Sequence, residues 1–224
     1  MKDEKQLAKF REKIARIKDE ATISHCLQKT SKEYRSYDPG WYLYRKLNEE
    51  NKRRDIFSDD YLELVYVTLC SWNMNQRAAK LANFEDFKRI IRESRSTILS
   101  LKGYKIENIK DLDNVLKAIE VLFHNLRNIC HQESKIVTFS KCLHFMLPHL
   151  IVPVDRKYTM MFFQNNVMIP KGIQKQLQLY KTLFLCCHDL TICFDLTKYL
   201  GDRWNENIPK VIDNIIIGYQ KIHS

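Results

Sequence analysis

The chain has 224 residues and a mass of 26.8 kDa, which suffices for one large domain or two small ones with a sizeable core. Hydrophobic residues make up 45% and charged residues 29%, so the composition excludes a disordered or fibrous chain. Only 5 glycines and 5 prolines are present, too few for turn-rich β-sandwiches or glycine-loop nucleotide folds. The composition therefore predicts an all-α protein.

Lysine and arginine outnumber aspartate and glutamate by 37 to 27, which gives a net charge of +10. This balance suits a polyanion, because each neutralised phosphate releases condensed counterions. An acidic membrane surface and a solvated surface without a partner are the alternatives. The seven cysteines are odd in number and show no zinc or iron–sulfur spacing, so we expect reduced thiols and no metal or other cofactor.

The N-terminal third predicts helices separated by short breaks. Residues 1–22 carry apolar side chains at helical spacing between lysines and arginines, which indicates an amphipathic basic helix. The Asp-Pro-Gly sequence at 38–40 predicts a turn, and Asp59 and Asp60 are candidate caps for the next helix. Residues 61–72 are apolar almost all round, and their length without a turn signal favours a buried helix over a strand.

The helical pattern continues through the middle of the chain. After a break at 73–75, Asn83 with Asp86 predicts a helix start, and Gly103 predicts the end of that helix. Apolar residues at helical spacing predict another helix over 110–129.

The last part of the chain adds a polar, loop-like stretch at 130–140 and a short helix at 141–147. The segment before Asp155 is predicted to be extended, because Pro153 disfavours the α region for the residue before it. Asp155 opens the next helix, and two apolar stripes predict a long helix over 173–187 and a last one over 208–219.

We expect eight to ten helices in one helical domain over residues 1–224. A division into two lobes would assign about 60–130 to one lobe and 1–59 plus 131–224 to the other. The apolar runs are far shorter than the roughly 20 residues that span a bilayer, and the charged N-terminus predicts no secretory signal. We therefore expect no membrane partner and a cytoplasmic, nucleoid-associated monomer of a prokaryotic cell.

The informative segment runs from Ser140 to Tyr158. In it, Lys141 is predicted to begin a short helix, and an extended proline segment leads to Asp155 at the start of the next. Two helices that meet at their N-termini place a cation and a carboxylate at one cleft.

At this point the sequence resembles the helix-hairpin-helix DNA glycosylase superfamily over roughly residues 60–165. Lys141 matches the lysine of the family's helix start, and Asp155 in VPVDRKY matches its catalytic aspartate. Upstream, LVYVTLCSWNMNQRAAKLANFEDF has the rhythm of the family's helix junction. The sequence departs from the family pattern in three places. Residues 135–139, KIVTF, replace the hairpin glycines, and Arg156 and Lys157 replace the family's Thr-His. The interval between the lysine and the aspartate is also shorter than in the family.

The resemblance implies a two-lobed helical bundle with a basic cleft, and an enzyme that flips a damaged or modified base out of double-stranded DNA and excises it. Asp155 would stabilise the sugar cation and activate water, and Lys141 would either hold a phosphate or form a Schiff base with AP-lyase activity. The base-binding candidates, at the junction that faces the everted base, are Trp72, Asn73, Met74, Asn75 and Gln76. The phosphate-binding candidates are Arg77, Ser140, Arg156 and Lys157.

Other interpretations stay open at this stage. Asp155 could be a helix cap and nothing more. Lys141 could be a solvated surface cation, and Trp72 could be a plain core residue. A non-catalytic helical nucleic-acid-binding protein explains the charge and the helicity equally well, but not the closeness of the two helix starts. A helical adaptor for other proteins leaves the charge of +10 unexplained. For a glycosylase, both DNA repair and defence against phage with modified bases are compatible with the sequence.

Overall fold

The computed structural model describes residues 2–34, 37–53, 55–74, 80–202 and 204–223. These residues are helical with short connections, and their extended segments meet only in a single antiparallel bridge between Leu81 and Cys130. The expected all-α class is therefore confirmed. No helix in the described part of the chain is long and apolar enough to cross a bilayer.

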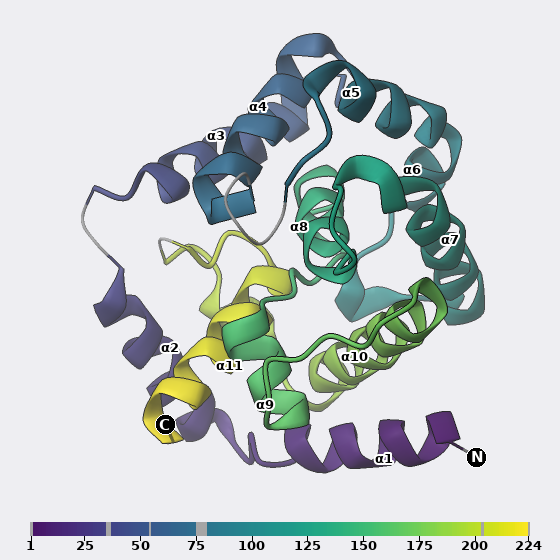
Figure 1. The fold of residues 1–224 in the computed structure, drawn as a ribbon. Coiled ribbons are helices and arrows are strands. Elements are labelled where there is room, and N and C mark those ends of the chain that lie inside the picture. Colours follow the sequence, from purple (N-terminus) through teal and green to yellow (C-terminus); the bar gives the residue numbers. More distant parts are fainter. Residues whose placement is uncertain (1, 35–36, 54, 75–79, 203, 224) are drawn as a thin grey trace.

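Eleven α-helices occur in the described ranges (Figure 1): α1 (Lys2–Ile14), α2 (Glu20–Glu33), α3 (Pro39–Arg53), α4 (Asp59–Leu69), α5 (Phe84–Glu93), α6 (Arg95–Leu101), α7 (Leu112–Asn125), α8 (Ile136–Met146), α9 (Met161–Gln164), α10 (Ile173–Cys193) and α11 (Ile208–His223). Short helical turns join some of them: η1 (Cys70–Met74), η2 (Ile106–Asn108), η3 (Leu126–Ile129), η4 (Arg156–Met160) and η5 (Leu196–Tyr199).

Helix α8 is the centre of the molecule. All eleven of its residues are buried, and α3, α4, α10 and η3 pack against it. Figure 1 shows α8 between the arc formed by α3 to α7 and the group formed by α9, α10 and α11. The core is one continuous hydrophobic cluster to which every α-helix contributes. The proposed division into two lobes stays a prediction.

The first helices differ from the expected bounds. The helix expected over 1–22 is two helices, because Asp19 accepts a hydrogen bond from the Thr22 amide at 2.7 Å and begins α2. The turn expected at 38–40 is the first turn of α3, where Pro39 occupies the position that needs no amide donor. Helix α4 is capped by the Ser58 hydroxyl rather than by the two aspartates after it.

The stretch expected to be a loop at 130–140 is also partly helical. Helix α8 begins at Ile136, so Lys141 lies in the middle of a helix instead of at its start. The N-terminal amides of Lys135 and Ile136 donate to Oε1 of Gln176 on α10, at 2.8 and 3.2 Å. A side chain from a distant helix thus supplies the cap that the local sequence lacks.

Other expected starts and stripes are confirmed. The side chain of Asn83 accepts a hydrogen bond from the Asp86 amide and begins α5, and Asp155 caps η4. The helix expected to run to Gly103 is interrupted at Ser94, where α6 takes over. The two late apolar stripes correspond to α10 and α11.

Candidate active site

Lys141 and Asp155 meet in the lining of a pocket. The Lys141 ammonium lies 3.7 Å from Oδ2 of Asp155, and the lysine is 8% exposed. Lys141 comes from the buried helix α8, whereas Asp155 comes from the end of the extended segment that follows it. The expected juxtaposition of a cation and a carboxylate is present, although Lys141 does not begin a helix.

The two oxygens of Asp155 have different partners. Oδ1 accepts hydrogen bonds from the amides of Lys157 and Tyr158, at 2.7 and 3.2 Å, and so caps η4. Oδ2 faces Lys141. The backbone is fixed as well, because the Asp155 amide donates to Thr159 Oγ1 at 2.9 Å. Capping and a role at the pocket are therefore compatible in this residue.

Ser140 fixes the segment that carries Asp155. Its hydroxyl accepts a hydrogen bond from the Val154 amide at 2.9 Å and donates to the Val137 carbonyl. The residue is completely buried. The expectation that Ser140 binds a DNA phosphate is therefore wrong for this structure, since its hydroxyl is engaged and inaccessible.

Burial lowers the pKa of the Lys141 ammonium. The nearby Asp155 and Asp213 carboxylates act in the opposite direction, and the Lys210 ammonium adds to the lowering. A lysine with a lowered pKa more easily supplies the neutral amine that a nucleophile needs. The geometry thus places a lysine, whose neutral form burial favours, next to a carboxylate.

Trp72 and Asn73 lie beside this pair, at the end of η1. The helix breaks there because Asn73 adopts a left-handed conformation, with φ at 62°. Asparagine tolerates that conformation better than most residues. The half-buried Trp72 ring packs against Tyr44, Phe145 and Trp204, so it belongs to an aromatic cluster as well as to the pocket wall.

A second ion pair faces the same pocket from α11. The Lys210 ammonium lies 2.5 Å from Oδ2 of Asp213, and both side chains are less than a tenth exposed. Burial by itself lowers the pKa of Lys210, but the attraction and hydrogen bond of Asp213, together with Tyr34 and Tyr44, raise it overall. The Lys210 ammonium lies 5.5 Å from the centre of the Trp72 ring and 5.3 Å from that of Trp204.

The pocket has a volume of about 350 Å³, within the range of pockets that bind small ligands. Its lining combines aromatic rings with two lysines and two aspartates, so the formal charges of the lining balance. The expected basic cleft therefore stays a prediction. The lining residues are Tyr34, Trp72, Asn73, Lys141, Pro153, Val154, Asp155, Tyr158, Trp204, Lys210, Asp213 and Ile217.

A hydrogen-bonded chain lies behind the aromatic cluster. Nδ1 of His144 lies 2.6 Å from the Ile151 carbonyl, which can only accept, so this nitrogen carries the proton. Nε2 then accepts from the Tyr44 hydroxyl at 2.8 Å, and that hydroxyl accepts from Asn207. Burial lowers the pKa of His144 to about 3, so this histidine is neutral and structural.

The other residues expected in the site differ in whether a ligand can reach them. Arg156 and Lys157 are exposed beside Asp155, where a phosphate can reach them. Met74 is buried, and the Thr138 hydroxyl contacts its sulfur, so contact with a base is not available to it in this structure. The expectations for Asn75, Gln76 and Arg77 lie outside the described residues.

Sequence reasoning did not single out the α11 side of the pocket, which contributes Trp204, Lys210 and Asp213. One signal was present. Lys210 and Asp213 are three residues apart in IPKVIDNIII, where every helical face is otherwise mostly apolar. A lysine and an aspartate inside such a helix must be paired in the interior.

The chain has no significant match among protein-family models, curated proteins or solved structures. A functional argument must therefore come from the chemistry of the pocket.

Proposed function

We propose that this protein is a DNA N-glycosylase that flips a damaged or modified base into the pocket and excises it. The observation that carries the proposal is the Lys141–Asp155 pair, 3.7 Å apart, in the lining of a pocket that also contains aromatic rings. Aromatic walls suit a flipped base, which stacks on side chains after it leaves the duplex. The net charge of +10 favours a partner rich in phosphates.

Asp155 has the right setting for the chemical step. Cleavage of the bond between base and sugar leaves the electron pair on the base and builds positive charge on the sugar. A carboxylate fixed by two backbone amides stabilises that charge without reorganising. It can then accept the proton of the water that adds to C1′ of the sugar.

Lys141 offers two roles that chemistry can separate. As an ammonium it holds a phosphate and water is the nucleophile, which makes the enzyme monofunctional. As a neutral amine it attacks C1′, the base departs with the bonding electrons, and Asp155 takes the proton of the resulting ammonium. The sugar ring then opens to a Schiff base, which is the intermediate of an AP lyase.

The decisive experiment replaces Asp155 by asparagine and measures excision on a panel of damaged and modified DNAs. Asparagine caps helices about as well as aspartate, so we expect Asp155→Asn to stay folded and to bind DNA. It lacks the charge that stabilises the sugar cation, and excision should fall by several orders of magnitude. Asp111 is a matched control, because it caps α7 through the Asn114 amide and does not line the pocket.

Full excision by Asp155→Asn, or the same loss in Asp111→Asn, would contradict the mechanism. Borohydride then identifies the nucleophile, because it reduces a Schiff base to a stable adduct. An adduct with the wild type but not with Lys141→Gln identifies Lys141, whereas excision without any adduct identifies water. If the wild type binds DNA but excises no base from it, the protein is a non-catalytic nucleic-acid-binding protein.

A further inference from the structure

The ion pair of α11 lines the same pocket as the proposed catalytic pair. Lys210 and Asp213 are 4% and 5% exposed, and both line the same pocket as Lys141 and Asp155. Helix α11 packs against η4, the turn that Asp155 caps, which brings the two ion pairs to one cavity. The chemistry proposed for Lys141 and Asp155 does not use this second pair.

Stability alone does not explain a buried pair at this position. Burying two charges costs desolvation energy that their attraction often fails to recover, and apolar residues of similar volume commonly do as well or better. The surrounding residues of α11, including Ile212 and Ile216, are fully buried and apolar. Charged groups retained beside a pocket are candidates for ligand recognition.

We propose that Lys210 and Asp213 read the edge of the flipped base, and that this base carries a lactam, a ring carbonyl next to a ring N–H. This inference rests on the proposed function and names its substrate class: oxopurines and oxopyrimidines. The ammonium has only donors and binds the carbonyl oxygen, whereas the carboxylate has only acceptors and binds the N–H. The neighbouring Trp72 ring lines the same pocket and supplies an apolar surface within reach of the base.

Two arguments favour a lactam over the amidine edge of adenine or cytosine. When a lactam base leaves with the bonding electrons, the negative charge spreads onto its carbonyl oxygen, where the Lys210 ammonium stabilises it. Amidine bases leave more readily after gaining a proton. Lys210 is a poor proton donor, because Asp213 raises its pKa.

The pair is held in place from both sides. The Lys210 amide donates to Oδ1 of Asn207 at 3.0 Å, and Trp204, beside the ammonium, stacks on Tyr34 with 4.7 Å between ring centres. These contacts fix the start of α11 and one wall of the pocket. A preformed donor and acceptor discriminate between base edges better than mobile groups do.

Free bases in matched pairs test this inference without a DNA substrate. Hypoxanthine and adenine differ by lactam against amidine at the same edge, and so do uracil and cytosine. The two pyrimidines are used as their 1-methyl derivatives, because free cytosine presents a lactam at N1–H and C2=O that the sugar blocks in DNA. Trp72 and Trp204 line the pocket, so tryptophan fluorescence reports binding. We expect half-saturation by hypoxanthine and uracil at concentrations at least about tenfold lower than by adenine and cytosine, a difference of about 1.4 kcal/mol.

The double variant Lys210→Met/Asp213→Leu replaces the pair by apolar side chains of similar volume and leaves no unpaired charge. We expect it to fold and to lose the preference for lactam bases. Lys210→Gln/Asp213→Asn is a second, neutral variant in case the first fails to fold. The control is Lys181→Met/Glu120→Leu, which removes an ion pair between α10 and α7 that lies outside the pocket lining and should keep the preference.

Equal affinity within each pair, the opposite order, or no quenching by any of the four bases overturns the lactam assignment. So does an unchanged preference in the folded variants. The outcomes also separate the two proposals. A lactam preference without excision of any DNA base contradicts the proposed glycosylase activity and supports base recognition by Lys210 and Asp213. Excision without the preference supports the glycosylase activity and contradicts that recognition.

Discussion

At the residue scale, Asp155 divides its two carboxylate oxygens between a helix cap and the ion pair on which the proposed chemistry depends. Oδ1 caps a helical turn, and Oδ2 faces the ammonium of Lys141, which is itself buried. The sequence allowed this part of the site to be predicted, because the pair lies within 15 residues and follows a local motif. The α11 side could not be derived in the same way, since about 50 residues separate it from Asp155 and only packing brings them together.

His144 gives a prediction for the pH dependence of stability. Its pKa is about 3 in the folded protein and 6.5 when unperturbed, so between these values the unfolded chain binds a proton that the folded protein does not. The free energy of unfolding therefore falls as the pH falls through this window, by about 1.4 kcal/mol per pH unit well below 6.5. Glutamine can keep a donor and an acceptor but does not titrate, so His144→Gln should lack this contribution.

Urea denaturation of both proteins from about pH 7 to about pH 5 measures the difference, since the carboxylates common to both cancel. The wild type should lose more stability than His144→Gln over this range. Parallel curves would mean that His144 titrates equally in the folded and the unfolded chain.

At the scale of elements, α8 shows what a local sequence cannot reveal. Its first residues read as a loop, because the preceding stretch is polar, Lys135 directly before the helix is not a capping residue, and Val137 and Thr138 are β-branched. The missing cap is the Gln176 side chain, which lies 40 residues further along the chain and binds the first amides of α8. Helices with their own caps, such as α5 with Asn83, were predictable.

The crossing of α2 and α11 depends on Gly218. A Cβ atom at this position would lie 1.9 Å from the carbonyl oxygen of Cys26 and 2.7 Å from Oγ1 of Thr30. Gly218→Ala must push the two helices apart, so we expect a loss of about 3 kcal/mol in the free energy of unfolding. Gly103→Ala is the control, because a Cβ atom there meets nothing within 4 Å.

Thermal and urea denaturation of the two glycine variants compare these effects directly. The control should change the free energy of unfolding by no more than about 0.5 kcal/mol. Equal stabilities of Gly218→Ala and Gly103→Ala would show that α2 and α11 do not approach as closely as described.

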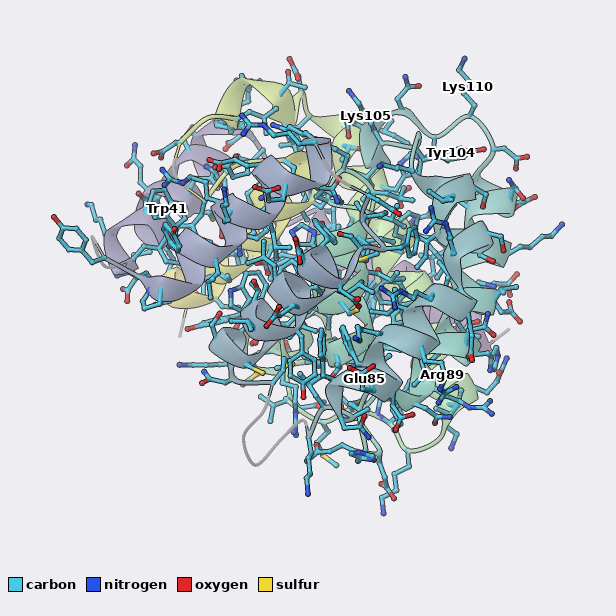
Figure 2. The ribbon with its side chains drawn as sticks, turned by 90° about the horizontal axis from the view of Figure 1, so that it is seen from above. Trp41, Glu85, Arg89, Tyr104, Lys105 and Lys110 are labelled. Carbon is cyan, nitrogen blue, oxygen red and sulfur yellow. The ribbon has the colours of Figure 1, made fainter. Side chains whose placement is uncertain are left out.

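At the scale of the whole molecule, the excess of positive charge is not confined to the pocket. Figure 2 shows Lys105 and Lys110 at the top of the view, well apart from Glu85 and Arg89 below them. The pocket itself holds equal numbers of lysines and aspartates. Attraction of DNA is therefore expected from the outer surface, and discrimination between bases from the pocket.

We expect the affinity for DNA to fall steeply with salt, because each phosphate contact releases counterions. Lys157, exposed beside Asp155, should contribute one such contact, so Lys157→Gln should reduce the slope of log affinity against log salt by about one. Lys110→Gln is the control, since Lys110 is exposed but does not line the pocket. Affinity that is independent of salt, or an equal change in both variants, would count against this interface.

The enclosure of α8 also governs how the protein opens. Its neighbours α3 and α4 precede it in the chain and α10 follows it, so solvent reaches its amides only when all of them separate. In hydrogen–deuterium exchange we expect the α8 amides to be among the slowest, with opening free energies equal to that of global unfolding. Faster exchange in α8 than in the N-terminal α1 would contradict this. On this expectation Lys141 is anchored in the last element to open, and its ammonium keeps its place in the pocket lining for as long as α8 stays folded.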